Sequence, residues 1–318
     1  MDYKSILIIR PSSLGNVLHA LMITQTIRDH FPNAEIDFLV SSQFAPIVKH
    51  CQTVDNLIIF KRKGGPFGFW KLLKEIRKKE YDAVLDIQAQ FRTGLIIAAS
   101  RSKLKIGRSD AREGSGVFCN HIIDHPEKPN PHQLDTFLKF LPALGIPEEL
   151  GSPVNFKTPA IETIAPELAT NPPILLLPHS RGKEKEWPNF RQLTHKILKE
   201  LPGRLVVWDS HIPIPSKELA AEILFLNTTG KTSISEMISL VKGAIVVVAN
   251  DTGPMHIAAA LAKPTIAIFG PTKIEKYGAY PLDSPRNINL QSNTSDWSDI
   301  TVDEVFSELK GLLQSAGT

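Results

Sequence analysis

The residues best suited to chemistry lie between Ala244 and Thr272, in the sequence AIVVVANDTGPMHIAAALAKPTIAIFGPT. An apolar run ends there at the polar turn Asn250-Asp251-Thr252-Gly253, and Pro254 follows where a helix can begin. The first N–H groups of such a helix lie at the positive end of its dipole, so the turn predicts an anion-binding site. An ordinary βαβ unit without a ligand has the same pattern and is the alternative.

A second turn of the same kind lies near the start of the chain. The apolar run Ser5 to Arg10 leads into Pro11-Ser12-Ser13-Leu14-Gly15-Asn16, and an amphipathic pattern continues to His30. Hydroxyl and amide side chains in such a turn can orient a ligand at the C-terminal edge of a parallel sheet. The sequence therefore predicts one polar turn in each half of the chain.

Strands and helices alternate around these turns. In the first half we expect strands at 5–10, 35–40, 56–60 and 83–87, helices at 15–30, 44–49, 70–80 and 131–144, and a loop-rich region at 103–124. In the second half we expect strands at 174–177, 204–208, 244–249 and 264–269, and helices at 189–201, 215–224, 233–241, 254–261 and 302–314. This alternation predicts an α/β fold in which helices cover both faces of parallel sheets.

A proline-rich stretch with weak periodicity, residues 147–173, predicts a domain boundary. We expect an N-terminal domain at 1–160 and a C-terminal domain at 161–318, with a last helix that could pack back on the first domain. Two Rossmann-like domains would place their C-terminal strand edges face to face across a cleft.

Composition narrows the class of protein. The chain has 318 residues, of which 42% are hydrophobic, and no stretch approaches the ~20 apolar residues that span a bilayer. The start of the chain runs straight into a strand and not into an export signal, so we expect a cytoplasmic protein. Cys51 and Cys119 have neither metal-binding spacing nor a disulfide framework, which suits a reducing compartment.

Positive charge is concentrated in one region. Residues 61–112 hold 14 Lys and Arg but 5 Asp and Glu, whereas the net charge of the whole chain is only +3. A solvated helix face explains much of the run from Lys71 to Lys79, and an anionic partner is the alternative for the other basic residues. No reading motif or aromatic-interleaved groove accompanies them, so we do not expect nucleic acid.

Six motifs stand in order along the chain: RPSSLGNVLH (10–19), YDAVLDIQ (81–88), DARE (110–113), SRGKEKEWP (180–188), NDTGPMH (250–256) and FGPT (269–272). As a set they closely resemble the ADP-heptose lipopolysaccharide heptosyltransferases, family 9 of the glycosyltransferases, and are most similar to heptosyltransferase I. The resemblance implies a bacterial enzyme of lipopolysaccharide core biosynthesis with the GT-B fold, which consists of two Rossmann-like domains. It also implies inverting, metal-independent transfer without a cofactor.

The resemblance implies a donor site in the C-terminal domain, made of Ser180, Lys185, Asp251, Thr252, Gly253 and His256. Lys185 would supply positive charge to the diphosphate, and Thr252 and Gly253 would offer hydrogen-bond donors at the helix start. Because a carboxylate repels phosphate, we expect Asp251 to bind a sugar hydroxyl or to order the turn. A buried structural histidine is the alternative for His256.

The acceptor in this family is a phosphorylated, acid-sugar lipid core, so the resemblance implies basic contacts in the N-terminal domain. The matching residues are Lys61, Arg62, Lys63, Arg92 and Arg112. The glycine-rich segment 64–69 looks like a mobile loop that could meet the membrane or the acceptor, and a surface loop without a partner is equally compatible. We therefore expect a cytoplasmic enzyme with possible peripheral contact to the inner membrane.

The chain departs from the family at Asn16, where members carry the aspartate proposed as general base. An amide can orient a hydroxyl but cannot accept its proton. Three replacements are open: Asp86, His19 one turn along the helix, or a carboxylate of the substrate, and His19 could equally be structural. Arg181 replaces a hydroxyl residue, and Asp209 or Glu218 could substitute for an absent acidic cluster near the ribose.

These observations predict a glycosyltransferase that moves a heptose from ADP-heptose to an anionic lipopolysaccharide inner core. A catalytically weak or inactive nucleotide-sugar-binding homologue is the alternative, because of Asn16. A Rossmann oxidoreductase is disfavoured, because no G-x-G-x-x-G follows a strand.

Overall fold

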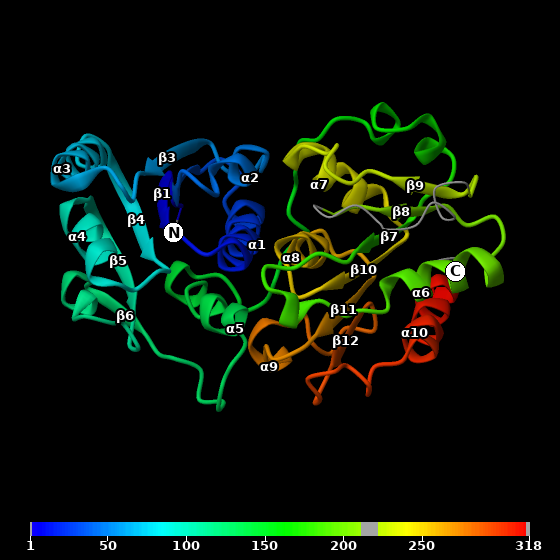
Figure 1. Cartoon of the computed structure of the whole chain (residues 1–318). Helices are drawn as coiled ribbons and strands as arrows, with labels where there is room; N and C mark the ends of the chain where they lie inside the picture. Colours follow the sequence, from blue (N-terminus) through cyan, green and yellow to red (C-terminus); the bar gives the residue numbers. More distant parts are fainter. Residues whose placement is uncertain (1, 211–221, 316–318) are drawn as a thin grey trace. The chain divides into compact units, whose positions relative to one another are not determined.

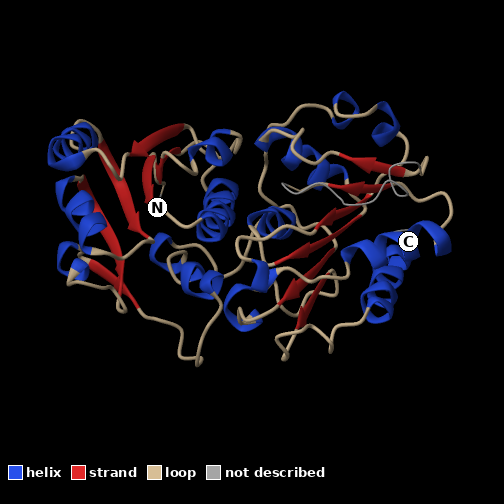
Figure 2. Cartoon of the chain, in the orientation of Figure 1, coloured by secondary structure: helices blue, strands red, loops and turns tan. Residues whose placement is uncertain are grey.

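A computed structural model describes residues 2–210 and 222–315 of the chain. It divides into two compact units, unit 1 (Met1–Lys157) and unit 2 (Thr158–Thr318), each with its own sheet (Figures 1 and 2). Within the described ranges, no helix has both the length and the apolar character needed to cross a bilayer.

Unit 1 is built on a parallel sheet of six strands in the order β3-β2-β1-β4-β5-β6. The strands are β1 (Ser5–Ile9), β2 (Glu35–Ser41), β3 (Asn56–Phe60), β4 (Glu80–Asp86), β5 (Arg101–Arg108) and β6 (His121–Ile123). The helices are α1 (Leu14–His30), α2 (Ala45–Lys49), α3 (Gly65–Ile76), α4 (Phe91–Ala99) and α5 (Gln133–Leu138). Central strands such as β1 are buried on both faces because helices cover both sides of the sheet.

Unit 2 repeats this order in its own strands, as β12-β11-β10-β7-β8-β9, all parallel. The strands are β7 (Ile174–Leu177), β8 (Val206–Trp208), β9 (Phe225–Asn227), β10 (Val246–Asn250), β11 (Thr265–Phe269) and β12 (Asn287–Gln291). The helices are α6 (Phe190–Glu200), α7 (Ile234–Gly243), α8 (Gly253–Ala260), α9 (Ile274–Tyr277) and α10 (Val302–Ser315). Both sheets are therefore Rossmann-like, which confirms the predicted fold class.

Each sheet reverses its strand order at one place, between β1 and β4 in unit 1 and between β7 and β10 in unit 2. Loops on the two sides of such a switch point leave in opposite directions and open a crevice at the C-terminal ends of the strands. The two polar turns expected from the sequence follow β1 and β10, so each lies at the switch point of its own unit.

The last helix, α10, contributes to the core of unit 2. Val305, Phe306 and Leu309 are buried together with Trp187 and Phe190 of the same unit. The apolar face of α10 is thus used within unit 2, whereas the sequence also allowed packing on the N-terminal domain.

Three expectations about the elements of unit 1 were wrong. The segment 64–69, expected as a mobile loop, contains the first turn of α3, because Pro66 suits the start of a helix. Glu80 begins β4 and does not end the preceding helix. The region 103–124, expected to be loop-rich, contains most of β5, all of β6 and the short 3₁₀ helix η1 (Ser115–Phe118).

Other elements were missed because their sequence signals are weak. The alternating charges of β5 hide its apolar pattern, and the strands β6, β9 and β12 are three to five residues long. Helix α4 was not expected either. The helix expected at 215–224 falls largely on residues 211–221, which lie outside the described residues, as does Glu218.

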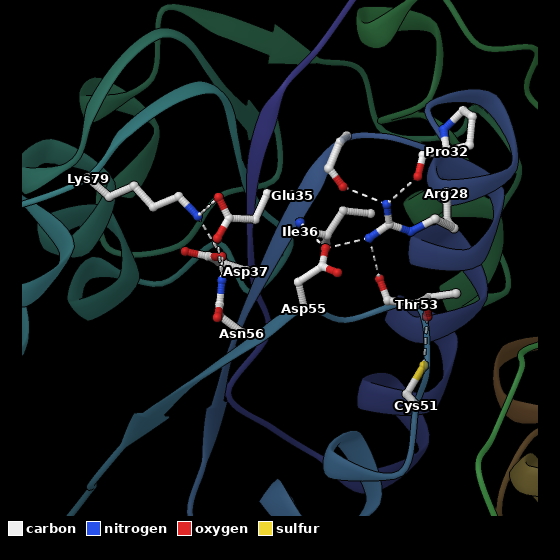
Figure 3. A network of polar contacts seen from close by, with 11 residues as sticks. Arg28, Pro32, Glu35, Ile36, Asp37, Cys51, Thr53, Asp55, Asn56 and Lys79 are labelled. Carbon is white, nitrogen blue, oxygen red and sulfur yellow. Dashed lines mark hydrogen bonds and ion pairs between the residues drawn. The ribbon is translucent and has the colours of Figure 1, made fainter.

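The N-terminal ends of β2, β3 and β4 carry a dense polar network (Figure 3). Asp37 is almost fully buried and accepts hydrogen bonds from Tyr81 Oη at 2.7 Å, Lys79 Nζ at 2.9 Å and Asn56 Nδ2 at 2.9 Å. Lys79 also pairs with Glu35 at 2.9 Å. This network ties the N-terminal ends of three strands together, whereas ligands of open α/β sheets bind at the C-terminal ends of the strands.

Candidate functional sites at the two switch points

The predicted donor residues of unit 2 come together from two loops. Lys185, in the loop after β7, places Nζ 2.8 Å from Oδ2 of Asp251, in the turn after β10. Ser180, also after β7, donates its hydroxyl to the backbone carbonyl of Asp251 at 3.0 Å. Residues that are 66 positions apart in sequence thus form one ion pair at the sheet edge.

The loop after β7 is held by residues that sequence reasoning did not assign. Asn250 is fully buried at the end of β10, where its Nδ2 donates to the carbonyl of Pro178 at 2.6 Å. Its Oδ1 accepts from the backbone N–H of Trp187 at 3.1 Å. Glu186 adds a second tie, because Oε1 accepts from the backbone N–H of Ser180 at 3.0 Å. An amide at the end of an apolar run was the only sequence signal of this role.

A glycine lets a third segment approach the same loop. A Cβ added to Gly270, directly after β11, would lie 2.9 Å from the carbonyl oxygen of Glu184 and 2.8 Å from the ring of Trp297. Both contacts are closer than real Cβ atoms tolerate. The position of the loop that carries Lys185 therefore depends on glycine at 270, within the FGPT motif.

Helix α8 starts at the ion pair. Thr252 is its N-cap and accepts from the backbone N–H of Met255 at 3.4 Å, and Gly253 is the first helical residue. The first turn of a helix leaves backbone N–H groups without intrahelical partners. Asp251 thus has a lysine as its ion-pair partner and lies directly before the N-cap of α8, whose terminus carries partial positive charge.

His256 lies one turn into α8 and is 6% exposed. Burial lowers the pKa of His256 to about 4, with Asp251 acting to raise this pKa and Lys185 to lower it. The imidazole is therefore neutral at pH 7, and both the buried structural role and a role near the donor agree with this placement.

Asp209, at the end of β8, is the one of the two acidic residues considered for the ribose position that lies among the described residues. It is 4% exposed, and both of its carboxylate oxygens accept from the Thr232 hydroxyl, at 3.1 and 3.0 Å. A buried carboxylate held in this way can orient a hydroxyl group at the strand ends.

In unit 1, Asn16 lies in the first turn of α1, half-buried, and its Nδ2 reaches Ser13 Oγ at 3.4 Å. The first turn of α1 contains no acidic residue. His19, one turn later, is 2% exposed, and its ring centroid is 5.1 Å from that of His132 and 6.4 Å from that of Phe137. This contact with α5 and the residue before it favours the structural role that the sequence left open for His19.

Asp86 ends β4 and is 1% exposed. Its carboxylate accepts from the backbone N–H of Ala89 at 3.0 Å and from the Thr93 hydroxyl at 2.9 Å, which ties the turn to α4. Burial raises the pKa of Asp86 to about 6, although the hydrogen bonds and the nearby Arg10 act to lower it. The carboxylate is thus occupied within its own turn.

Two arginines also converge on the switch point of unit 1. Arg10 Nη1 donates to the carbonyl of Ile87 at 2.8 Å, and Arg108 Nη1 reaches the same oxygen at 3.3 Å. Burial and the neighbouring Arg108 lower the pKa of Arg10 to about 9. Sequence reasoning did not assign either residue, although an arginine that ends an apolar strand was a visible signal.

The predicted acceptor residues share this edge of unit 1. Lys61, Arg62 and Lys63 are exposed directly after β3. The guanidinium of Arg92 lies 5.8 Å from the ring of Phe60, the last residue of β3. Arg112 is exposed, and its backbone N–H donates to the carbonyl of Ala89 at 3.0 Å, which ties its loop to the turn after β4.

Among the residues that the structure describes, no three His, Cys, Asp or Glu side chains are grouped as metal ligands. Positive charge at the candidate sites is supplied by lysine, arginine and a helix terminus.

Two Rossmann-like units in one chain, each with a polar switch point, define the architecture of GT-B glycosyltransferases. The chain belongs to glycosyltransferase family 9 (heptosyltransferase), whose model matches residues 69–301, and it is a glycosyltransferase. The predicted family is thereby confirmed.

Two curated relatives and one solved structure illustrate the similarity. The lipopolysaccharide core heptosyltransferase OpsX of Haemophilus influenzae is 28% identical over 84% of this chain and 79% of its own. Lipopolysaccharide heptosyltransferase 1 of Salmonella typhimurium is 27% identical over 86% of this chain and 91% of its own. E. coli heptosyltransferase WaaC with ADP superimposes with a TM-score of 0.74 at 23% identity, covering 97% of this chain and 99% of that one. At this identity, the similarity to the solved structure supports the fold alone.

Proposed function

We propose that the protein transfers a heptose from ADP-heptose to an anionic lipopolysaccharide inner-core acceptor. The observation that carries the proposal is the Lys185–Asp251 pair beside the N-terminus of α8, at the switch point of unit 2. The names of the curated relatives, lipopolysaccharide heptosyltransferases, support the choice of sugar and acceptor.

In the proposed donor complex the ion pair binds two parts of one molecule. Lys185 and the first N–H groups of α8 contact the diphosphate, while the Asp251 carboxylate accepts from a sugar hydroxyl. The negative charge that develops on the departing ADP is stabilised by groups already in place, which is an effective form of electrostatic catalysis. In this proposal, transfer needs no metal and no cofactor.

Transfer follows an inverting displacement. An acceptor hydroxyl oxygen forms a bond to the anomeric carbon on the face opposite the diphosphate, and the bond from that carbon to the phosphate oxygen breaks with its electron pair leaving on ADP. The hydroxyl proton passes to a base. Because Asp86 and His19 are buried, we assign this base to a carboxylate of the acid-sugar acceptor, with Asn16 orienting the hydroxyl.

The acceptor is held in the proposal by Lys61, Arg62, Lys63, Arg92 and Arg112. Their exposed positions after β3, at the start of α4 and after β5 suit a large anionic group. A lipid-linked acceptor would bring the protein to the cytoplasmic face of a membrane.

The second candidate function is binding of a nucleotide sugar with weak transfer or none. The observation that favours it is Asn16, in a first turn without an acidic residue. In this case the donor site of unit 2 remains and only the proton acceptor is lost.

Release of ADP from ADP-heptose, with and without a core-lipid acceptor, tests the proposal. We expect acceptor-dependent release, whereas binding of the nucleotide sugar without release would favour the second candidate.

The donor site is tested by calorimetry. Asp251→Ala should weaken ADP-heptose binding about ten- to hundredfold, because a charged hydrogen bond is lost. Asp283→Ala, an exposed acid of the same unit, is the control. Equal affinity of the two variants would contradict the donor site, and a thermal-shift comparison of ADP-, GDP- and UDP-sugars would identify the nucleotide.

A further inference from the structure

The exposed aromatic residues of unit 1 gather on one part of its surface. Phe67 is 76% exposed and Trp70 is 50% exposed, both in α3, and Phe91 at the start of α4 is 46% exposed. Val117 in η1 is 80% exposed. Large apolar side chains exposed together commonly mark an interaction site.

These four residues belong to adjoining elements. The ring of Phe60, at the end of β3, contacts Phe69 of α3 at 6.3 Å between centroids and the guanidinium of Arg92 of α4 at 5.8 Å. Phe91 contacts Phe118 of η1 at 6.2 Å. Helices α3 and α4 lie side by side (Figure 1). We call the surface formed by Phe67, Trp70, Phe91 and Val117 the aromatic face.

Positive charge surrounds the aromatic face. Residues 61–79 contain eight Lys and Arg and one acid, Glu75. Lys74 Nζ lies 3.5 Å from the centroid of the Trp70 ring, and the Phe67 ring stacks on Trp70 with centroids 6.2 Å apart. Lysine with aromatic residues on one helix is the pattern of helices that lie in the interface of anionic membranes.

We propose that the aromatic face docks on an anionic lipid bilayer. Phe67 and Trp70 enter the boundary between headgroups and acyl chains, while Lys71 and Lys74 pair with lipid phosphates. Nucleic acid fits less well, because Phe67 and Lys74 already contact the Trp70 ring on which a base would stack. Loops after β3, β4 and β5 leave the same edge of the parallel sheet, so the docked face adjoins the basic residues assigned to the acceptor. That last connection rests on the proposed function, whereas lipid binding itself does not.

The four tryptophans make the proposal directly measurable. Trp187, Trp208 and Trp297, all in unit 2, are 2 to 6% exposed, so Trp70 is the one tryptophan that can meet lipid. The full chain is titrated with vesicles of phosphatidylcholine alone and of phosphatidylcholine with phosphatidylglycerol. With the anionic vesicles we expect a blue shift of the emission, quenching by brominated acyl chains and co-sedimentation that weakens with salt.

Variants separate the two parts of the face. Phe67→Ser should weaken vesicle affinity about tenfold, since the burial of one aromatic ring is lost. Lys71→Gln should weaken it about fivefold at low salt. Ile223→Ser, which changes an aliphatic side chain of unit 2 that is 96% exposed, is the control and should bind as the wild type. All these side chains are exposed, so unchanged melting temperatures are expected.

Three results would overturn the proposal: no binding to anionic vesicles at low salt, binding without a change in Trp70 emission, or equal affinity of Phe67→Ser and the wild type. Tighter binding of a single-stranded RNA, with quenching of Trp70, would overturn it in favour of nucleic acid. Failure of heptosyl transfer would leave the vesicle result unchanged, so the two proposals can fail separately.

Discussion

The ends of β4 and β10, with the turns that follow them, occupy the same place in the two sheets, and each of these regions carries an aspartate. The surroundings of the two aspartates are opposite. Asp86 in unit 1 accepts from Ala89 and Thr93 and is shut away from solvent. In unit 2 the buried Asn250 ties the turn instead, and the next residue, Asp251, is left to pair with Lys185. Unit 2 thus separates the residue that holds the turn from the carboxylate that can meet a ligand.

This difference explains why Asp86, at the switch point of unit 1, is not an exposed base. The carboxylate of Asp86 ties its turn as the amide of Asn250 does in unit 2. The turn after β1 carries an amide, Asn16, where family members have an acid.

The two units also differ in charge. Residues 1–157 contain 21 Lys and Arg against 16 Asp and Glu, whereas residues 158–318 contain 15 against 17. Unit 1 therefore suits an anionic acceptor better than unit 2 does.

The largest effect is expected when the turn of unit 1 receives the carboxylate it lacks. For the second candidate function, in which the wild type has no base, Asn16→Asp should raise the rate of transfer by about 10² to 10⁴-fold, the usual contribution of a general base. Where the acceptor carboxylate serves as the base, the rate should change little. ADP release under saturating ADP-heptose measures this change, and Asn16→Ser is the control that restores no basicity. If the wild type shows no turnover and Asn16→Asp creates it, the protein is a binding homologue and not an enzyme in its present form.

The next effect is expected when the ion pair of unit 2 is broken. Lys185→Met should lower the rate of transfer by about 10² to 10³-fold, because charge stabilisation of the departing ADP is lost. Lys183→Met is a matched control, since Lys183 lies two residues earlier in the same loop and is exposed. Equal rates for the two variants would remove Lys185 from the site.

The two units are expected to respond oppositely to pH. The pKa of Asp86 is raised to about 6, so its contribution to the stability of unit 1 is fully present at low pH and is lost as pH rises through 6. The pKa of His256 is lowered to about 4, so its contribution to unit 2 is present above the unfolded pKa of about 6.5 and is lost as pH falls toward 4. Each contribution should change by about 2 kcal/mol between pH 4.5 and 7.5.

Amide hydrogen exchange of peptides from β4 and β10 measures these contributions separately. Comparing each variant with the wild type at one pH cancels the intrinsic exchange rate. Asp86→Asn should increase the relative protection of β4 from pH 4.5 to pH 7.5, and His256→Gln should decrease that of β10 over the same range. Parallel pH profiles of wild type and variant would contradict the corresponding assignment.

A smaller effect is expected from crowding the loop that positions Lys185. Gly270→Ala should destabilise the protein by about 1 to 3 kcal/mol and weaken ADP-heptose binding, because the new Cβ meets the Glu184 carbonyl and the Trp297 ring. Gly311→Ala is the control: nothing lies within 4 Å of its Cβ in helix α10, and alanine should stabilise by about 0.5 to 1 kcal/mol. Denaturant unfolding and calorimetry give the two readouts. Unchanged binding in Gly270→Ala would show that Lys185 does not depend on this contact.

Much of the architecture could be predicted because strong local patterns coincide with the elements. The apolar runs became β1, β2, β3, β7, β10 and β11, and Thr252 and Pro254 began α8 as expected. The missed strand β5 has charged residues on an exposed face, and the start of α3 was hidden by glycines that usually indicate a loop. These errors concern unit 1, where the positive charge that distinguishes the unit obscures the apolar pattern.

The sequence by itself determined the class of fold, the family motifs, the two polar turns and the uneven distribution of charge, because each depends on residues close together in the chain. Tertiary structure alone decided which aspartate is paired with a lysine and which is tied into its own turn. Asp251 is paired by a lysine 66 positions away, and the buried Asn250 bonds to residues 63 and 72 positions away. Burial and electrostatic pairing are properties of neighbours in space, so the two aspartates differ in their partners: Asp86 is tied into its own turn, and Asp251 is paired with Lys185.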